Sequence, residues 1–563
     1  MYYPEIHLPV PEGSHFERNA PNGDGIFYLR YRVRSYRDEN GKKKHERIFL
    51  GKIFKDQETG LEYLCPSDDY YLKYKKEPLP VGAVIRKRGR PKQTNKQTKT
   101  YFEQQDSIGF GYMLACHKIV KDLKLDELLK DAFGNLATSI IAVGSFFAAG
   151  APGGLTNIDH FTKKNMCFTS KIISSDDLCD LYSNLHQSMR DDFFRNWIKL
   201  CCANDCVCYD VTSISNYSER MPFVAWGYNR DKEALPQFNV GMFCTIKSKM
   251  PVYFCQYNGN INDFTNFPYV INQAKQVGIG SDSKLTLVID GGFAVPETIE
   301  NAVKNGFDLI VGAPCDFGVR IKESLLAWRR NSSKADAHII RRGTESIRYY
   351  EEPMTIGRVK TRLILYKSPL AAIAQETSLT TLVNRLESEL NDRNWISSSG
   401  EEKFKPFFNI SQREDKGFDF KLDDHVFKES LQLCGCFALF CTRKDLDSEQ
   451  VLSLYRDKDY VEKAFAALKN DILNERMYTK SFDSTNGKLF LAFIGLIIRK
   501  TLESKLRAYL NKNRIGLDSA IDRLSDISCR KDGETWILDK ALTKQQKELV
   551  EILQLPVSYL NQI

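Results

Sequence analysis

The chain has 563 residues, of which 42% are hydrophobic and 27% are charged, with a formal net charge of +8 and a sequence pI near 8.6. This composition excludes a disordered or fibrous chain and predicts about two to four globular domains with a large buried core. The mildly basic balance permits a polyanionic partner without requiring one.

Fifteen cysteines leave three alternatives open, which are disulfides, a metal site and buried thiols. No two cysteines are spaced Cys-x-x-Cys, and the densest group, between Cys201 and Cys208, leads into an apolar strand. This pattern favours small buried thiols in a reducing cytoplasm. No signal peptide is expected at the start. The uncharged stretch 134–158 contains Ser, Gly, Pro, Thr and Asn, and this content predicts a buried helix and turn rather than a membrane span. We therefore expect a soluble, cytoplasmic protein.

Residues 1–78 alternate polar and apolar side chains around turn signals, which predicts a small β-rich N-terminal module. Residues 27–33 and 47–50 are the clearest strands, and they flank a turn at residues 39–42.

Residues 79–105 form a basic linker with no acidic residue before Glu103. Within it, Arg88-Gly89-Arg90-Pro91 matches the core of the AT-hook, an extended segment whose Arg side chains lie in narrow A·T-rich minor grooves. General attraction of phosphates by a flexible basic segment is the alternative interpretation. The candidate DNA-binding residues here are Arg86, Lys87, Arg88, Arg90 and Lys92.

Residues 106–204 have the apolar spacing of helices and are a possible DNA-end-binding module. From 205 to 314 the pattern changes to three strands, a helix, a strand, a helix and a strand. This βββαβαβ order is typical of an RNase H-like core. Within it, Asp210 lies in one short apolar strand and Asp290 ends another, positions where a strand core would not choose a carboxylate.

About 170 residues separate Asp290 from the next candidate acid, which is far more than a simple connection needs. Residues 315–445 are therefore expected to be a β-rich insertion. Its Trp328, beside two arginines, and Trp395 are candidates for stacking on a DNA base, although buried core positions are the stronger alternative.

Residues 446–510 complete the core with a helix. At 100° per residue, Tyr455, Lys458, Glu462 and Lys469 fall within roughly 60° of one another on that helix. A carboxylate between cations suits a site for a divalent cation and a phosphate, although ordinary surface charge pairs are the alternative. Two strand aspartates followed by a helical glutamate predict two-metal phosphoryl transfer.

These residues resemble the DDE transposases of bacterial insertion sequences, specifically the insertion sequence 4 family and its insertion sequence 1634 branch. That family's third-acid signature is Tyr, two residues, Arg, three residues, Glu, six residues, Lys. This chain has Tyr455, Lys458, Glu462 and Lys469 at those spacings, with Lys in place of Arg. The motifs Gly227 to Asp231 and Gly259 to Asp263 also match, although turn and helix-cap chemistry explains them equally.

The resemblance implies a multidomain α/β protein. Its RNase H-like core would be a mixed five-stranded sheet with flanking helices, interrupted by the β-rich insertion and preceded by the β-rich and helical modules. Residues 511–563 would form a helical tail. Asp210, Asp290 and Glu462 would be the catalytic and metal-binding residues for two Mg²⁺ or Mn²⁺ ions, while Lys469, Lys458 and Tyr455 would contact DNA.

The implied activity is cut-and-paste transposition. A homodimer would bind the terminal inverted repeats and the target as double-stranded DNA, then cleave and join strands. Two alternatives stay open: an RNase H-like nuclease without joining activity, and a catalytically idle DNA-binding regulator derived from a transposase.

Overall fold

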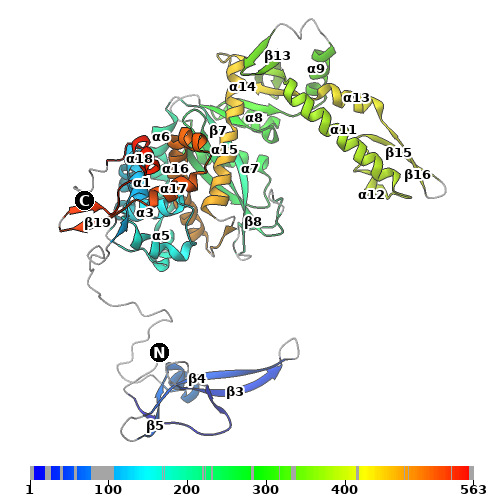
Figure 1. Cartoon of the computed structure of the whole chain (residues 1–563). Coiled ribbons are helices and arrows are strands. Elements are labelled where there is room, and N and C mark those ends of the chain that lie inside the picture. Colours follow the sequence, from blue (N-terminus) through cyan, green and yellow to red (C-terminus); the bar gives the residue numbers. More distant parts are fainter. Residues whose placement is uncertain are drawn as a thin grey trace. The chain divides into compact units, whose positions relative to one another are not determined.

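The computed structural model describes residues 6–19, 27–37, 42–55, 60–77 and 107–556, with gaps at 168, 170, 204, 218–220, 222, 230–232, 281–284, 316–317, 331–337, 414–416, 474–475, 480 and 534. The chain divides into two compact units, Met1–Lys99 and Thr100–Ile563 (Figure 1). The basic linker expected at 79–105 lies outside the described residues.

The first unit contains a five-stranded antiparallel sheet in the order β1-β5-β4-β3-β2. Its elements are β1 (Leu8–Pro9), β2 (Phe16–Asn19), β3 (Phe27–Arg37), β4 (Lys43–Lys55), β5 (Glu62–Pro66) and the π-helix η1 (Tyr70–Lys75). Its small core forms because alternate strand residues face one side, where Leu29, Leu50, Ile53 and Leu64 are buried with Tyr70.

The second unit begins with a short strand and a group of helices. They are β6 (Ile108–Gly109), α1 (Gly111–Asp122), α2 (Leu125–Phe133), η3 (Gly134–Leu136), α3 (Ala137–Ala148), η4 (Leu155–Asn157), α4 (Ile158–Lys164), α5 (Ser175–Asn184) and α6 (Gln187–Cys202). Among the described residues, Leu125–Ala148 is long and apolar enough to cross a membrane, but it consists of two helices joined by a turn, and 56% of its apolar window is buried.

The centre of the second unit is a large mixed sheet. Its first strands are β7 (Val207–Asn216), β8 (Gln237–Thr245), β9 (Pro251–Asn258), β10 (Thr286–Ile289) and β11 (Asp308–Ala313), interleaved with α7 (Asp263–Gln276), η5 (Gly291–Phe293) and α8 (Pro296–Lys304). β7, β8 and β9 pair antiparallel, whereas β10 is parallel to both β7 and β11. The order β9-β8-β7-β10-β11 thus follows the expected βββαβαβ succession.

The sheet does not stop at five strands. It continues through β17 (Cys436–Cys441), β14 (Val359–Lys367), β13 (Glu345–Ile356) and β12 (Ile339–Arg342), and β18 (Arg476–Met477) pairs with β7, so that it has ten strands. The expected five-stranded count was wrong, because β17 pairs with β11 on one side and with β14 on the other. The inserted strands therefore extend the core sheet.

The insertion also contains more helix than its expected β-rich character allows. Its helices are α9 (Gly318–Arg330), α11 (Pro369–Asn391), α12 (Ser398–Glu401) and α13 (Asp424–Leu433), and β15 (Phe408–Gln412) pairs with β16 (Phe418–Leu422). α11, α12, β15 and β16 form an arm with its own core around Leu386, Leu390, Phe404 and Phe408 (Figure 1).

The chain returns from the sheet through α14 (Ser448–Asp457), α15 (Asp459–Ala466) and the π-helix η6 (Ala467–Ile472) to α16 (Phe482–Asn513). α16 is buried continuously from Thr485 to Leu502, because its central stretch from Leu489 to Ile498 is apolar on every side. Gly495 lets it approach α3 closely, since an added Cβ there would lie 2.7 Å from the Cβ of Phe147.

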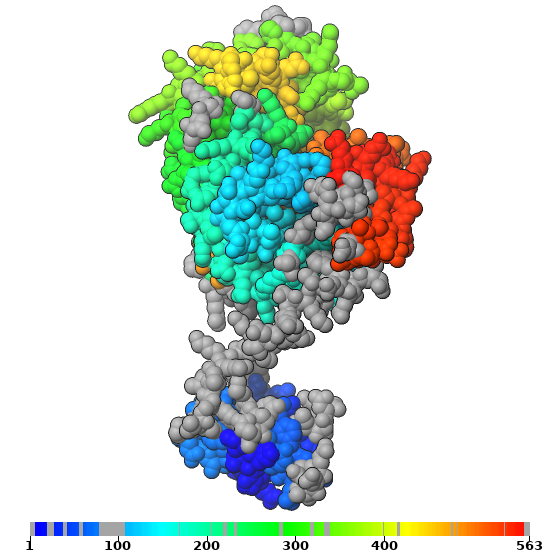
Figure 2. All heavy atoms as spheres, turned by 90° about the vertical axis from the view of Figure 1, so that its left-hand side faces the viewer, coloured from blue at the N-terminus to red at the C-terminus, as the bar shows by residue number. Residues whose placement is uncertain are grey.

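The tail was expected to be helical, but it also contains strands. It contains α17 (Leu517–Ser525), a hairpin of β19 (Ser528–Asp532) and β20 (Thr535–Leu538), and α18 (Lys544–Ile552). β19 also pairs with β6, which fixes the tail beside the start of this unit. Figure 2 shows the resulting surface, where the first helices (light blue) and the tail (red) lie side by side.

Candidate active site

Asp210 and Asp290 are neighbours because of strand register. β7 and β10 are adjacent and parallel, and Ile289 lies opposite Tyr209, so that Asp290 at the end of β10 follows beside Asp210. Neighbouring strands lie about 4.8 Å apart. Side chains alternate along β7, and Tyr209 points to the face where it contacts Phe267 of α7, so that Asp210 points to the other face.

Glu462 reaches these aspartates from α15, which packs on β7 and β8. The expected single regular helix from Tyr455 to Lys469 is wrong. It is interrupted at Lys458, where α14 ends and α15 begins, and it widens into the π-helix η6 at Ala467. The helical path continues through both irregularities, so that Glu462 still faces the strands.

The three acids line one cavity of about 420 Å³. The other lining residues are Asn262, Asp263, Gly292 and Phe293. Asp263 adds a fourth carboxylate and accepts a hydrogen bond of 2.6 Å from the Tyr257 hydroxyl. Sequence reasoning gave Asp263 no catalytic role, although its motif was the signal that could have placed it here.

Tyr455 and Lys458 contact the carboxylates of Asp290 and Glu462. The Tyr455 hydroxyl donates to Oδ1 of Asp290 at 3.0 Å. Burial, followed by the charge of Asp290, raises the pKa of Tyr455 above its ordinary value, so that the hydroxyl stays protonated at neutral pH. The buried Lys458 ammonium lies 3.3 Å from Oε1 of Glu462 and 3.9 Å from Oδ1 of Asp290.

Gly312 on β11 makes the Tyr455 contact possible. A Cβ at this position would lie 2.5 Å from the Tyr455 hydroxyl oxygen and 2.8 Å from the backbone nitrogen of Gly291, the residue after Asp290. Side-chain carbons do not approach other atoms so closely, so any larger residue would displace Tyr455, Gly291 or both.

Lys469 lies deeper than a DNA-contacting residue was expected to lie. It is 9% exposed, and its ammonium donates to Oγ1 of Thr212 at 3.5 Å. Thr212 is two residues beyond Asp210 on β7 and shares its face. Lys469 therefore places a positive charge behind the acidic cavity.

The donor set fits hard divalent cations, which bind carboxylate oxygens. However, no three His, Cys, Asp or Glu side chains in the described part of the chain are close enough to form one ligand group. Asp290 accepts a hydrogen bond from Tyr455, and Glu462 accepts one from Lys458. Asp210 beside Asp290 and Asp210 facing Glu462 are the two pairs that could each bind an ion.

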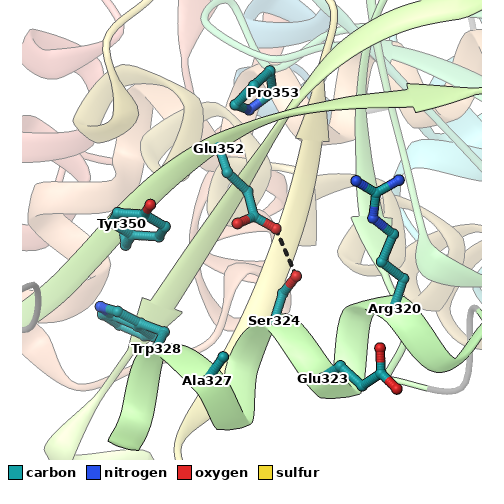
Figure 3. A pocket seen from close by; sticks show the side chains of 8 residues that line it. All are labelled: Arg320, Glu323, Ser324, Ala327, Trp328, Tyr350, Glu352 and Pro353. Carbon is teal, nitrogen blue, oxygen red and sulfur yellow. Dashed lines mark hydrogen bonds between the residues drawn. The ribbon is translucent and has the colours of Figure 1, made fainter. Parts of the chain in front are cut away.

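The other candidate residues lie elsewhere. Arg86, Lys87, Arg88, Arg90 and Lys92 are outside the described residues. Trp328 is only 4% exposed and lines a cavity of about 460 Å³ between α9 and β13, where Ser324 donates to Glu352 (Figure 3). Trp395, after α11, is 63% exposed. All fifteen cysteines are free thiols.

A carboxylate-lined cavity on a β9-β8-β7-β10-β11 sheet is compatible with chemistry on phosphate esters assisted by divalent cations. The family model described as "Transposase DDE domain" matches residues 203–498, which is more than half of the chain. The chain therefore belongs to the family of DDE-domain transposases.

No curated protein matches the chain. Among solved structures, the piggyBac transposase synaptic complex with hairpin DNA is similar with a TM-score of 0.31 and 12% identity, over 62% of this chain and 56% of that chain. This chain thus spans little more than half the length of that transposase.

Proposed function

We propose that this protein is an active transposase of the insertion sequence 4 family, in its insertion sequence 1634 branch. It binds the ends of its insertion sequence and catalyses metal-dependent strand cleavage and strand transfer. The observation that supports the proposal best is the convergence of Asp210, Asp290 and Glu462 on one cavity from two parallel strands and a helix distant in sequence.

Asp210, Asp290 and Glu462 would hold two Mg²⁺ or Mn²⁺ ions, with Asp210 shared between them. When bound, such ions polarise the scissile phosphate and lower the pKa of an attacking water or 3′-hydroxyl. Each ion would relieve the repulsion among the carboxylates, two of which already lie close to the Lys458 ammonium.

The residues around the acids position them. Tyr455 binds Oδ1 of Asp290 and leaves Oδ2 for other ligands. Lys458 can shift between Glu462 and a DNA phosphate because Lys is a flexible point charge rather than a bidentate fork. Tyr455 and Lys458 would also orient the transposon-end strand, and Lys469 would supply its charge to a phosphate that enters the cavity.

The DNA partners are the terminal inverted repeats and the target duplex. Because two ends must be joined to one target, a homodimer is the expected assembly in the DNA complex. We place the protein in the bacterial cytoplasm, bound to the nucleoid when it engages DNA.

The test is a cleavage and joining assay with the purified chain, Mg²⁺ and a labelled duplex that carries the element end. Cleavage followed by joining to a second duplex is the expected result. Cleavage without joining would identify a nuclease, and a gel shift without cleavage would identify an idle DNA-binding regulator. Neither binding nor cleavage would overturn the proposal.

A further inference from the structure

The hairpin of β3 and β4 in the first unit is strongly basic. Residues 27–55 contain ten Lys and Arg residues but only three Asp and Glu residues, a net charge of +7 compared with +8 for the whole chain. The hairpin thus carries a local excess of positive charge nearly as large as the net charge of the whole chain, which is the electrostatic pattern of a nucleic-acid contact.

The distal half of this hairpin projects as a two-stranded ribbon (Figure 1). β2 pairs with β3 only as far as Tyr31, and β5 pairs with β4 only from Gly51 onward. From Arg32 to Arg37, β3 pairs with β4 alone, and most side chains on both strands are exposed. At about 3.4 Å per residue the described ribbon extends roughly 20 Å.

The pairing within the ribbon places like charges opposite each other. Arg32 faces Arg47, and Arg37 faces Lys43. Like charges directly opposite each other destabilise an antiparallel pair. Glu17 on β2 forms ion pairs with Arg32 at 3.6 Å and with Arg47 at 2.5 Å. Its carboxylate therefore compensates the repulsion between Arg32 and Arg47 at the base of the ribbon.

Charged residues on exposed strands also prevent edge-to-edge aggregation. That purpose is served by charges of either sign, and Arg34 with Glu46 is such a balanced pair at 2.6 Å. The excess of cations over carboxylates in residues 27–55 is not explained by edge protection, because a balanced set would protect equally well.

We propose that the ribbon of residues 32–37 and 43–47 enters the major groove of double-stranded DNA and contacts the phosphates on both sides. A two-stranded ribbon fits this groove, which is about 12 Å wide. The inference deepens the proposed function, since it assigns a DNA contact to a unit separate from the acidic cavity. Within these two segments, Arg37, Lys43 and Lys44 are the exposed cations nearest the end, and Lys42, directly before Lys43, is exposed as well.

The test measures binding of the full chain to a short mixed-sequence DNA duplex without divalent cations, at several salt concentrations. The ribbon variant carries Arg37→Gln, Lys43→Gln and Lys44→Gln. A control in the tail removes three exposed cations through Lys531→Gln, Lys540→Gln and Lys544→Gln. A third variant keeps the ribbon charges through Arg37→Lys, Lys43→Arg and Lys44→Arg.

The ribbon variant is expected to bind roughly tenfold or more weakly near 0.1 M salt, and to lower the slope of log Kd against log salt by about 2.7, or 0.9 for each lost phosphate contact. Protection of guanine N7, which lies in the major groove, should disappear with it. The tail control and the charge-keeping variant should bind like the wild type. Double-stranded RNA, whose major groove is deep and narrow, should show a smaller ribbon effect, because only the general attraction of phosphates is lost there.

Unchanged affinity and slope in the ribbon variant would overturn the proposal, as would an equal loss in the tail control. Weaker binding with N7 protection retained would overturn the major-groove placement. Because binding is measured without cleavage, a catalytically inactive protein would leave this result standing, and an active protein without a ribbon effect would refute only this inference.

Discussion

Replacing Gly312 by Ala tests whether the contact between Tyr455 and Asp290 organises the acidic cavity. The added Cβ would lie 2.5 Å from the Tyr455 hydroxyl and 2.8 Å from the Gly291 nitrogen. The hydroxyl belongs to a side chain that donates to Asp290 at 3.0 Å, and Gly291 is bonded to Asp290 directly. Either displacement therefore moves the same carboxylate.

The expected cost of Gly312→Ala in stability is about 1–3 kcal/mol, the range for overpacking a buried position. The expected cost in cleavage rate is roughly 100-fold, because a displacement near 1 Å in a catalytic site has that effect. Single-turnover cleavage of the labelled element end measures the rate, and the urea midpoint measures stability. Gly516→Ala is the control, since nothing lies within 4 Å of the Cβ that it adds.

A double variant separates packing from chemistry. Gly312→Ala combined with Tyr455→Phe removes the oxygen that the new Cβ would meet, so part of the lost stability should return. Activity should stay low, because Asp290 then lacks its donor. Wild-type cleavage and stability in Gly312→Ala alone would show that Tyr455 and Asp290 do not depend on this close approach, which would refute the reasoning.

Three further predictions concern single side chains. Asp210→Asn or Glu462→Gln should abolish cleavage. The DNA affinity measured by gel shift should stay within about twofold of the wild type, since one ligand oxygen contributes little to the phosphate attraction that dominates DNA affinity. A loss of DNA binding would indicate a structural role instead. Lys458→Met leaves Asp290 and Glu462 without their shared cation. Mg²⁺ should therefore raise the Tm of this variant more than it raises the Tm of the wild type. An equal rise would contradict the idea that Lys458 neutralises the two carboxylates. Burial lowers the pKa of Lys488 from 10.5 to about 8, so the unfolded chain binds more protons between those values and stability should rise with pH from about 8 to 10.5. Lys488→Met should remove this rise and stabilise the protein at neutral pH by up to about 3 kcal/mol, measured as the denaturation midpoint across that pH range.

Local sequence patterns were enough to expect Asp210, Asp290 and Glu462 near one another, and all three line one cavity, while their catalytic role stays a prediction. A carboxylate at the end of an apolar parallel strand reaches the same sheet edge as one in the neighbouring strand, which links Asp210 to Asp290. The spacing from Tyr455 to Glu462 was enough to predict that both lie on the side of the strand acids, where Glu462 lines the cavity and Tyr455 donates to Asp290. It could not predict the interruption at Lys458, because that residue forms helical backbone without a Pro or Gly signal.

The full sheet could not be predicted, because pairing between strands distant in sequence leaves no local period. β17 joins β11 and β14 through residues as far apart as Ile310, Arg362 and Cys441. The hairpin in the tail was different, since Asp532-Gly533 is a recognisable turn signal between two short strands and Gly533 has a φ of +63°. Trp328 also fits the ordinary rule that Trp is mostly buried.

The pairing of β11 with β17 has a consequence for how such a protein can vary. The chain leaves the core along β11 and comes back along its hydrogen-bonded neighbour, so the start of α14, and with it Glu462, is fixed by the sheet rather than by the length of chain in between. The arm from Pro369 to Leu422 has its own small core and could be shortened, enlarged or exchanged without altering the distance between the acids. Changes of length and sequence can therefore accumulate in the arm while the spacing of the acids stays constant.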